Sequence, residues 1–98
     1  MEVRGVSPDC LKAVVDFERN IAQAEKIAAL MEYEEWSDEF VRDLLDRAMD
    51  ALEDVENYCN ISTAHEQDLL EDVIRGRISE GNISDVESTF YRKIERIF

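Results

Sequence analysis

Apolar residues recur along this chain at alternating intervals of three and four, the spacing of a helix with one buried face. The first such stretch begins at Ser7, a helix-capping residue followed by Pro8 at the first helical position, and runs to about residue 32. The second begins behind Ser37 and runs to Cys59. The two stripes are Cys10, Val14, Phe17, Ile21, Ala24, Ala28 and Met31, and then Val41, Leu45, Ala48, Leu52, Val55 and Cys59, widened by Leu44 and Met49.

Two shorter helices are predicted in the last third of the chain. Residues 60–62 and 82–84 both have the sequence Asn-Ile-Ser, in which the Asn ends one helix and a hydroxyl opens the next. Capping boxes, which mark the starts of the third and fourth helices, are predicted at Thr63 with Glu66 and at Ser84 with Glu87. The third helix is predicted to end near residues 79–81, shortly before the second box. The apolar positions of these helices are Leu69, Leu70, Val73, Ile74 and Ile78, and then Val86, Phe90, Ile94, Ile97 and Phe98.

These elements predict an all-α protein. Ninety-eight residues with 45% hydrophobic content suit a single helical domain, residues 1–98, with one modest core. The one Pro and three Gly leave little material for the tight turns of a β protein. Because short connections favour antiparallel neighbours, the expected fold is a compact antiparallel four-helix array of two long and two shorter helices.

The two cysteines are predicted to lie at the same level of this array. Cys10 and Cys59 are almost equally far from the turn near residue 35, so an antiparallel hairpin brings them together and permits a disulfide. The N-terminus has no apolar run after its first basic residue, and no stretch is long and apolar enough for a membrane span. We therefore expect a cytoplasmic protein that does not bind membranes, in which reduced thiols are favoured over the disulfide.

Charge is distributed unevenly along the chain. The formal net charge is −13, and residues 27–74 hold 15 of the 24 acidic residues but only two of the 11 basic ones. Such a field disfavours direct binding to nucleic acid and to anionic membranes, and it attracts basic partners. Solubility is the alternative explanation of the acidity.

The acids concentrate on the outer face of the second predicted helix, where their sign opposes helix stability. Glu53, Asp54 and Glu56 fall in its last turns, at the negative end of the helix dipole, where each acid costs about 0.3–1 kcal/mol. Acids of the third helix extend this face, and two aromatic residues at the first turn are suited to anchor a partner. The predicted partner-binding residues are Tyr33, Glu35, Trp36, Glu39, Asp43, Asp46, Asp50, Glu53, Asp54, Asp68, Glu71 and Asp72.

A row of carboxylates at helical spacing resembles the row of anions on a nucleic-acid backbone. In size and charge the chain resembles DNA-mimic inhibitors, which include antirestriction and anti-CRISPR proteins. The resemblance implies a partner with a basic, nucleic-acid-binding surface. The alternative is a small helical adaptor or structural subunit of a larger complex, whose apolar surface docks and whose acidity serves solubility. Homodimerisation stays open, with Arg92, Lys93 and Arg96 expected either to pair with acids of the same chain or to serve dimer contacts.

The sequence gives no support for an enzyme, a metal site or a cofactor. A di-iron bundle requires a Glu three residues before each metal-binding His. The single histidine of this chain, His65, has no acid at that position. Neither cysteine has a basic neighbour to activate its thiol, and there is no glycine-rich phosphate loop. We therefore expect a non-enzymatic protein without catalytic residues.

Overall fold

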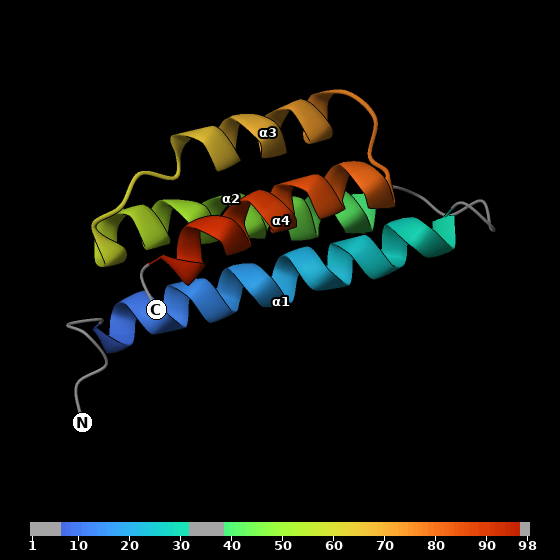
Figure 1. The fold of residues 1–98 in the computed structure, drawn as a ribbon. Coiled ribbons are helices and arrows are strands. Elements are labelled where there is room, and N and C mark those ends of the chain that lie inside the picture. The colour runs from blue at the N-terminus through green and yellow to red at the C-terminus, as the bar shows by residue number, and fades with distance from the viewer. Residues whose placement is uncertain (1–6, 32–38, 97–98) are drawn as a thin grey trace.

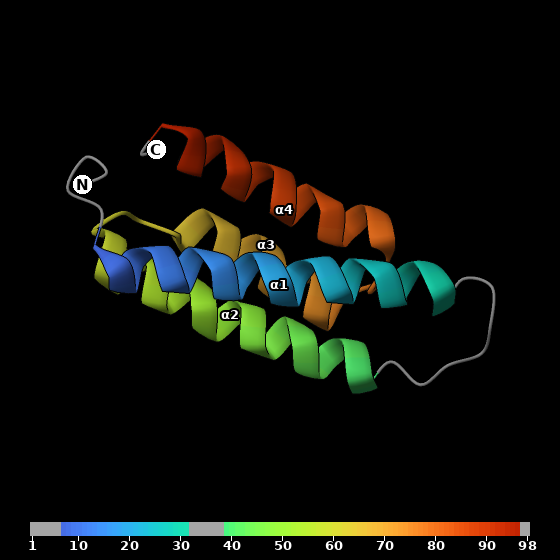
Figure 2. The same ribbon diagram turned by 90° about the horizontal axis from the view of Figure 1, so that it is seen from below.

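Four helices form in the part of the chain that the structure, a computed structural model, describes: residues 7–31 and 39–96. Helices α1 (Pro8–Met31) and α2 (Glu39–Cys59) are long, whereas α3 (Ala64–Arg75) and α4 (Glu80–Glu95) are shorter. Successive helices run in opposite directions (Figure 1). Helices α1 and α3 each pack against α2 and α4, so α1 lies diagonally opposite α3 and α2 opposite α4 (Figure 2). The predicted all-α, antiparallel four-helix array is confirmed.

The core is built from the predicted apolar stripes. In α1 and α2, the stripe residues Phe17, Ile21, Leu45 and Leu52 are completely buried, as expected of side chains that face the other helices. Phe17 also meets Phe90 of α4, with the ring centroids 4.3 Å apart. Burial of each such large apolar side chain contributes about 1.5–3 kcal/mol. The spacing of apolar residues in the sequence therefore identifies the face of each helix that points into the core.

Helix α1 begins as predicted, because the Ser7 hydroxyl oxygen accepts a hydrogen bond from the Cys10 amide at 3.1 Å. The predicted cap of α2, Ser37, lies outside the described residues. Asn60 follows the end of α2 with a φ of 57°, the left-handed conformation expected of an Asn that ends a helix. The capping signals at Ser7 and Asn60 are thus as the sequence predicts.

The start of α4 differs from the prediction by one turn. Helix α3 ends at Arg75, well before residues 79–81, and α4 begins at Glu80. Its N-cap is Ser79, whose hydroxyl oxygen accepts a hydrogen bond from the Asn82 amide at 3.2 Å, so the predicted cap at Ser84 is wrong. The earlier start places Ile83 on the buried face of α4, where it is completely enclosed. The free energy gained by burying Ile83 outweighs the preference for a helix start at Ser84.

The connection between α2 and α3 uses its polar residues differently from the predicted capping box. The Thr63 hydroxyl donates to the Leu52 carbonyl at 2.9 Å and accepts from the Gln67 side-chain amide at 2.8 Å. The Thr63 amide donates to Glu56 Oε1 at 3.0 Å. Glu66 turns away into the core between α3 and α4, so the predicted box of Thr63 and Glu66 is wrong. The hydroxyl instead joins α3 to the last turns of α2.

A disulfide joins the two ends of the α1–α2 hairpin. Cys10 and Cys59 lie level with one another, as predicted, and their Cα atoms are 4.8 Å apart, within the range that a disulfide spans. The expectation of two reduced thiols is wrong, because the antiparallel packing of α1 on α2 brings both side chains together at one end of the bundle. Disulfides are typical of oxidising compartments, so this bond removes one reason for expecting a cytoplasmic protein. No helix in the described ranges is long and apolar enough to cross a membrane.

Candidate functional site

One face of α2 carries a row of carboxylates directly opposite the core. The side of the helix that packs inward is wholly apolar, and every acid of the row is exposed to solvent. We call this row the acidic ridge and define it as Glu39, Asp43, Asp46, Asp50, Glu53 and Asp54.

Four of the six carboxylates of the acidic ridge form no ion pair with a described residue. Arg47 pairs with Asp43 at 3.1 Å, but both side chains are 63% exposed, and an ion pair of this kind contributes little stability. Arg42 reaches across to α3, where its guanidinium donates to the Ile74 carbonyl at 3.0 Å. Within residues 7–31 and 39–96, ion pairs are absent from four ridge members, namely Asp46, Asp50, Glu53 and Asp54.

The last turns of α2 contain no basic residue to offset the negative end of the helix dipole. Glu56, one of the three acids predicted to be costly there, has a structural role, because it accepts the hydrogen bond from the Thr63 amide. Glu53 and Asp54 accept no hydrogen bond from any described residue. The unfavourable interaction with the negative end of the helix dipole is therefore uncompensated only for Glu53 and Asp54 among these three acids.

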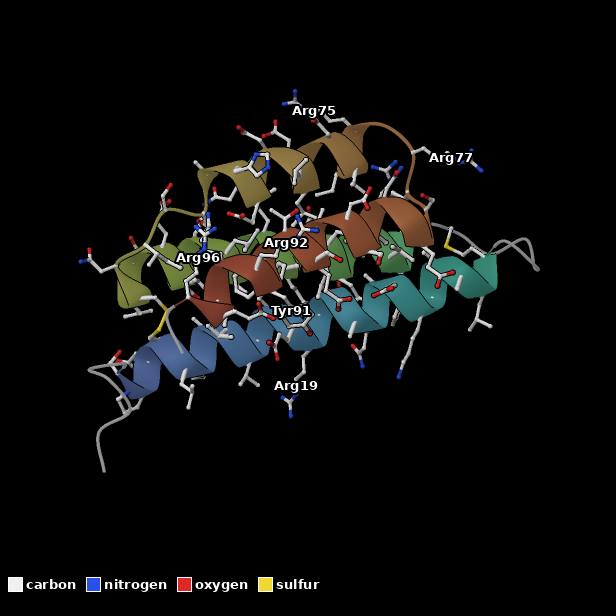
Figure 3. The ribbon with its side chains drawn as sticks, viewed as in Figure 1. Arg19, Arg75, Arg77, Tyr91, Arg92 and Arg96 are labelled. Atoms are coloured by element: carbon white, nitrogen blue, oxygen red, sulfur yellow. A yellow bond between two sulfur atoms is a disulfide. The ribbon has the colours of Figure 1, made fainter. Side chains whose placement is uncertain are left out.

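The arginines of α4 do not neutralise the acidic ridge. Helix α4 lies diagonally opposite α2, and Arg92 and Arg96 lie along a groove between α4 and α3 (Figure 3). Neither arginine forms an ion pair with any described residue, so of the two expectations, pairing with acids of the same chain is not seen for Arg92 and Arg96. Lys93 behaves as expected, because its Nζ donates to Glu66 Oε1 at 2.6 Å.

The predicted acids of α3 do not all share one surface with the ridge. Glu71 is half-buried and pairs with Arg75, while Asp68 is exposed. Asp72 lines a groove between α3 and α4 together with Asp85, on the side of α3 away from α2. The predicted residues Tyr33, Glu35 and Trp36 lie outside the described residues. The acidic ridge alone is therefore the part of the predicted surface that the fold assembles into one row.

A second carboxylate group, which the sequence analysis did not identify, lies between α1 and α4. Burial, a hydrogen bond that the protonated Glu87 carboxyl donates to Glu25, and the negative charges of Glu25 and Glu18 raise the pKa of Glu87 to about 7. Burial and the same carboxylates also raise the pKa of Tyr91. The sequence alone shows that Glu18 and Glu25, seven residues apart, lie on one face of α1. The sequence does not say that the α4 face carrying Glu87 packs beside them.

The protein is expected to lose stability as this carboxylate group loses its proton. Between pH 4.5 and pH 7, folded Glu87 holds a proton that the unfolded chain has released, so the free energy of unfolding falls as pH rises through this window. Because Glu87 is partly exposed, solvent screening limits the change to about 1 kcal/mol. Glu87→Gln should remove this part of the pH dependence in urea denaturation curves, whereas Glu95→Gln, at an exposed position of α4, should preserve it. Equal slopes for wild type and Glu87→Gln would contradict the assignment.

The described residues contain no group of three or more His, Cys, Asp or Glu side chains arranged to hold a metal ion. His65 is exposed and lines the α3–α4 groove beside Arg92 and Arg96. Comparison of the chain with models of protein families, with curated proteins and with solved structures finds no match. The acidic ridge is thus the feature on which a functional proposal can be built.

Proposed function

We propose that the acidic ridge binds the basic surface of a nucleic-acid-binding protein and that this chain acts as an inhibitor of the DNA-mimic type. The observation that carries the proposal is the absence of ion pairs at Asp46, Asp50, Glu53 and Asp54 among the described residues, although arginines are present elsewhere on the same molecule. Like charges held together without local compensation raise the free energy of the unbound protein. A cationic partner surface would lower it.

The charge density of the ridge is close to that of a nucleic-acid strand. From Glu39 to Asp54 the helix rises about 23 Å, and one strand of B-DNA carries about seven phosphates over that length. The ridge presents six carboxylates over the same distance. A groove whose Lys and Arg side chains follow a phosphate backbone would therefore meet a similar row of acceptors on this helix.

The proposal predicts that neutralising the ridge abolishes binding without harming the fold. In a variant with Asp43→Asn, Asp46→Asn, Asp50→Asn and Asp54→Asn, the loss of repulsion should leave stability unchanged or raise it by roughly 0.5–1 kcal/mol. The binding test uses immobilised protein and the heparin-retained fraction of a cell lysate, eluted with a salt gradient. A DNA-binding protein captured in this way should be displaced by duplex DNA, and it should lose its own DNA binding in the presence of this chain.

A matched control carries the same change of net charge away from the ridge. Asp9→Asn, Glu80→Gln, Asp85→Asn and Glu95→Gln replace four exposed acids on α1 and α4. This control should bind the captured protein as the wild type does, whereas the ridge variant should not. Equal binding by both variants would refute the ridge as the binding surface. If Phe40→Ala, at a side chain that is 66% exposed, then abolished capture, the helical adaptor would be the better description.

A further inference from the structure

The outer face of α1 carries three kinds of residue that each repeat every seven positions. Apolar residues occupy 8, 15, 22 and 29, and basic residues occupy 12, 19 and 26. Acidic residues occupy 18 and 25. A seven-residue repeat keeps a surface aligned along two helices that supercoil around each other, because it compensates for the helical period of 3.6 residues. The repeat is separate from the buried stripe that contains Phe17 and Ile21.

No described part of the chain covers this face. The α1 residues that line grooves against α2 are Asp9, Lys12, Ala13, Asp16 and Asn20, so Lys12 is the one member of the repeats that reaches this side of the helix. In Figure 2, α1 faces the viewer and no other helix crosses in front of it. Leu11 and Val15 are 50% and 44% exposed, which is high for apolar side chains within one helix. A groove of about 560 Å³ continues the apolar face, lined by Ala22, Glu25, Lys26, Ala29, Leu30 and Glu80.

The charges that flank the apolar positions lie on opposite sides of them. Glu18 and Glu25 are on the side next to α4, where they adjoin Glu87, and neither forms an ion pair with a described residue. The basic residues Lys12, Arg19 and Lys26 are on the other side and form no ion pair with any described residue. Arg19 points away from the bundle (Figure 3). Each flank therefore carries one sign of charge, although Lys12 also lines a groove with Asp9, Asp16 and Asp54 of the same chain.

We propose that this face of α1 is a self-association surface on which a second copy of the chain packs its own α1 in parallel. A two-fold axis parallel to the helices sets the acidic flank of one copy against the basic flank of the other. Glu18 then faces the partner's Arg19, and Glu25 faces the partner's Lys26. The symmetry makes each pairing twice, while the apolar positions of the two helices meet along the centre.

The charge pattern also selects the orientation of the two helices. In an antiparallel pair, the two-fold axis is perpendicular to the helices and brings each flank against the same flank of the other copy. Acidic residues would then face acidic residues, and basic residues would face basic ones.

Dimerisation on α1 is independent of the proposed function and adds to it. The groove that continues the apolar face is lined by α1 and by Glu80 of α4, whereas the acidic ridge is on α2. A dimer would therefore leave two ridges exposed. Two linked ridges engage a dimeric or repetitive basic surface more tightly than one, because the second contact becomes intramolecular.

Sedimentation equilibrium over a range of protein concentrations tests the proposal. The wild type should show a monomer–dimer equilibrium that salt weakens. Arg19→Glu/Lys26→Glu makes both flanks acidic and should raise the dissociation constant roughly tenfold or more, since several ion pairs become repulsive. Exchanging both flanks, in Glu18→Lys/Arg19→Glu/Glu25→Lys/Lys26→Glu, should restore the dimer. Gln23→Glu, at an exposed position outside the repeat, is the matched control and should associate as the wild type does.

Three outcomes would overturn the proposal. A wild type that is monomeric throughout the concentration series excludes self-association. An unchanged dissociation constant in Arg19→Glu/Lys26→Glu excludes the parallel pairing, because an antiparallel pair exchanges one like-charged contact for another. A variant with both flanks exchanged that folds, by circular dichroism, but stays monomeric excludes the flank complementarity. The ridge variant should remain dimeric, so failure of the proposed function and failure of the dimer are distinguishable.

Discussion

Replacing Lys93 by methionine is expected to lower the free energy of unfolding by about 3–5 kcal/mol, because it leaves a buried carboxylate without its counter-charge. Glu66 is 1% exposed, and Lys93 Nζ lies 2.6 Å from its Oε1. The same ammonium group donates to the Ser62 carbonyl at 2.6 Å, so one lysine joins α4 both to α3 and to the connection that precedes it. The measurement is urea denaturation followed by circular dichroism.

Two further variants separate the ion pair from the packing of the lysine stem. Adding Glu66→Gln to Lys93→Met removes the buried charge and should recover a large part of the lost stability. Arg92→Met is the matched control, since Arg92 is the exposed neighbour on α4 and has no ion pair among the described residues. It should change stability by less than about 0.5 kcal/mol. If Lys93→Met were as mild as Arg92→Met, the buried pair would not be a major contributor to stability.

Removing the disulfide is expected to have an effect of similar size. Cys10 and Cys59 are 49 positions apart, and in the chain-entropy account a crosslink over that distance stabilises a protein by about 4 kcal/mol. Cys10→Ala/Cys59→Ala should therefore unfold at a much lower urea concentration than the oxidised wild type. A domain of this size has a total stability of about 5–15 kcal/mol, so the loss is a large fraction of the whole.

The reduced wild type provides the control for this prediction. Dithiothreitol should lower the unfolding midpoint of the wild type toward that of the double variant and should not affect the double variant itself. Thiol titration in denaturant should find no free thiol in the oxidised protein. Two free thiols, or a wild-type midpoint that does not respond to reductant, would show that the cysteines are not bonded and would restore the expectation drawn from the sequence.

Tertiary structure changes how the acidity of α2 is interpreted. The sequence suggests that every acid near the end of the helix is a local cost, but Glu56 binds the Thr63 amide and thereby joins α2 to the start of α3. The sequence also suggests that arginines of the last helix neutralise acids of the same chain, yet α4 is diagonal to α2 and Arg92 and Arg96 face α3. Fewer acids than the sequence implies therefore favour an external partner, namely the four ridge carboxylates that form no ion pair with a described residue.

The sequence is sufficient for the number, type and inner faces of the helices. The period of three and four residues identifies Phe17, Leu45 and Phe90 as core positions, because burial of an apolar stripe is the main source of helix stability in a protein. It also predicts the cap at Ser7 and the left-handed Asn60, since both depend only on neighbouring residues. The start of α4 was missed because Ser79 and Ser84 offer similar local chemistry. Burial of Ile83 against the other helices distinguishes them.

The order of residues is enough to place each helix and its two faces, including the row of carboxylates on α2 and the seven-residue repeats on α1. Which faces meet depends on the packing of the helices, which brings Glu66 to Lys93, Cys10 to Cys59, and Glu25 to Glu87. The reason is physical, since helical periodicity is a property of neighbours within about four positions along the chain. The pairing of distant side chains depends instead on which helices are adjacent and which are diagonal, and that arrangement is fixed by packing of the whole core.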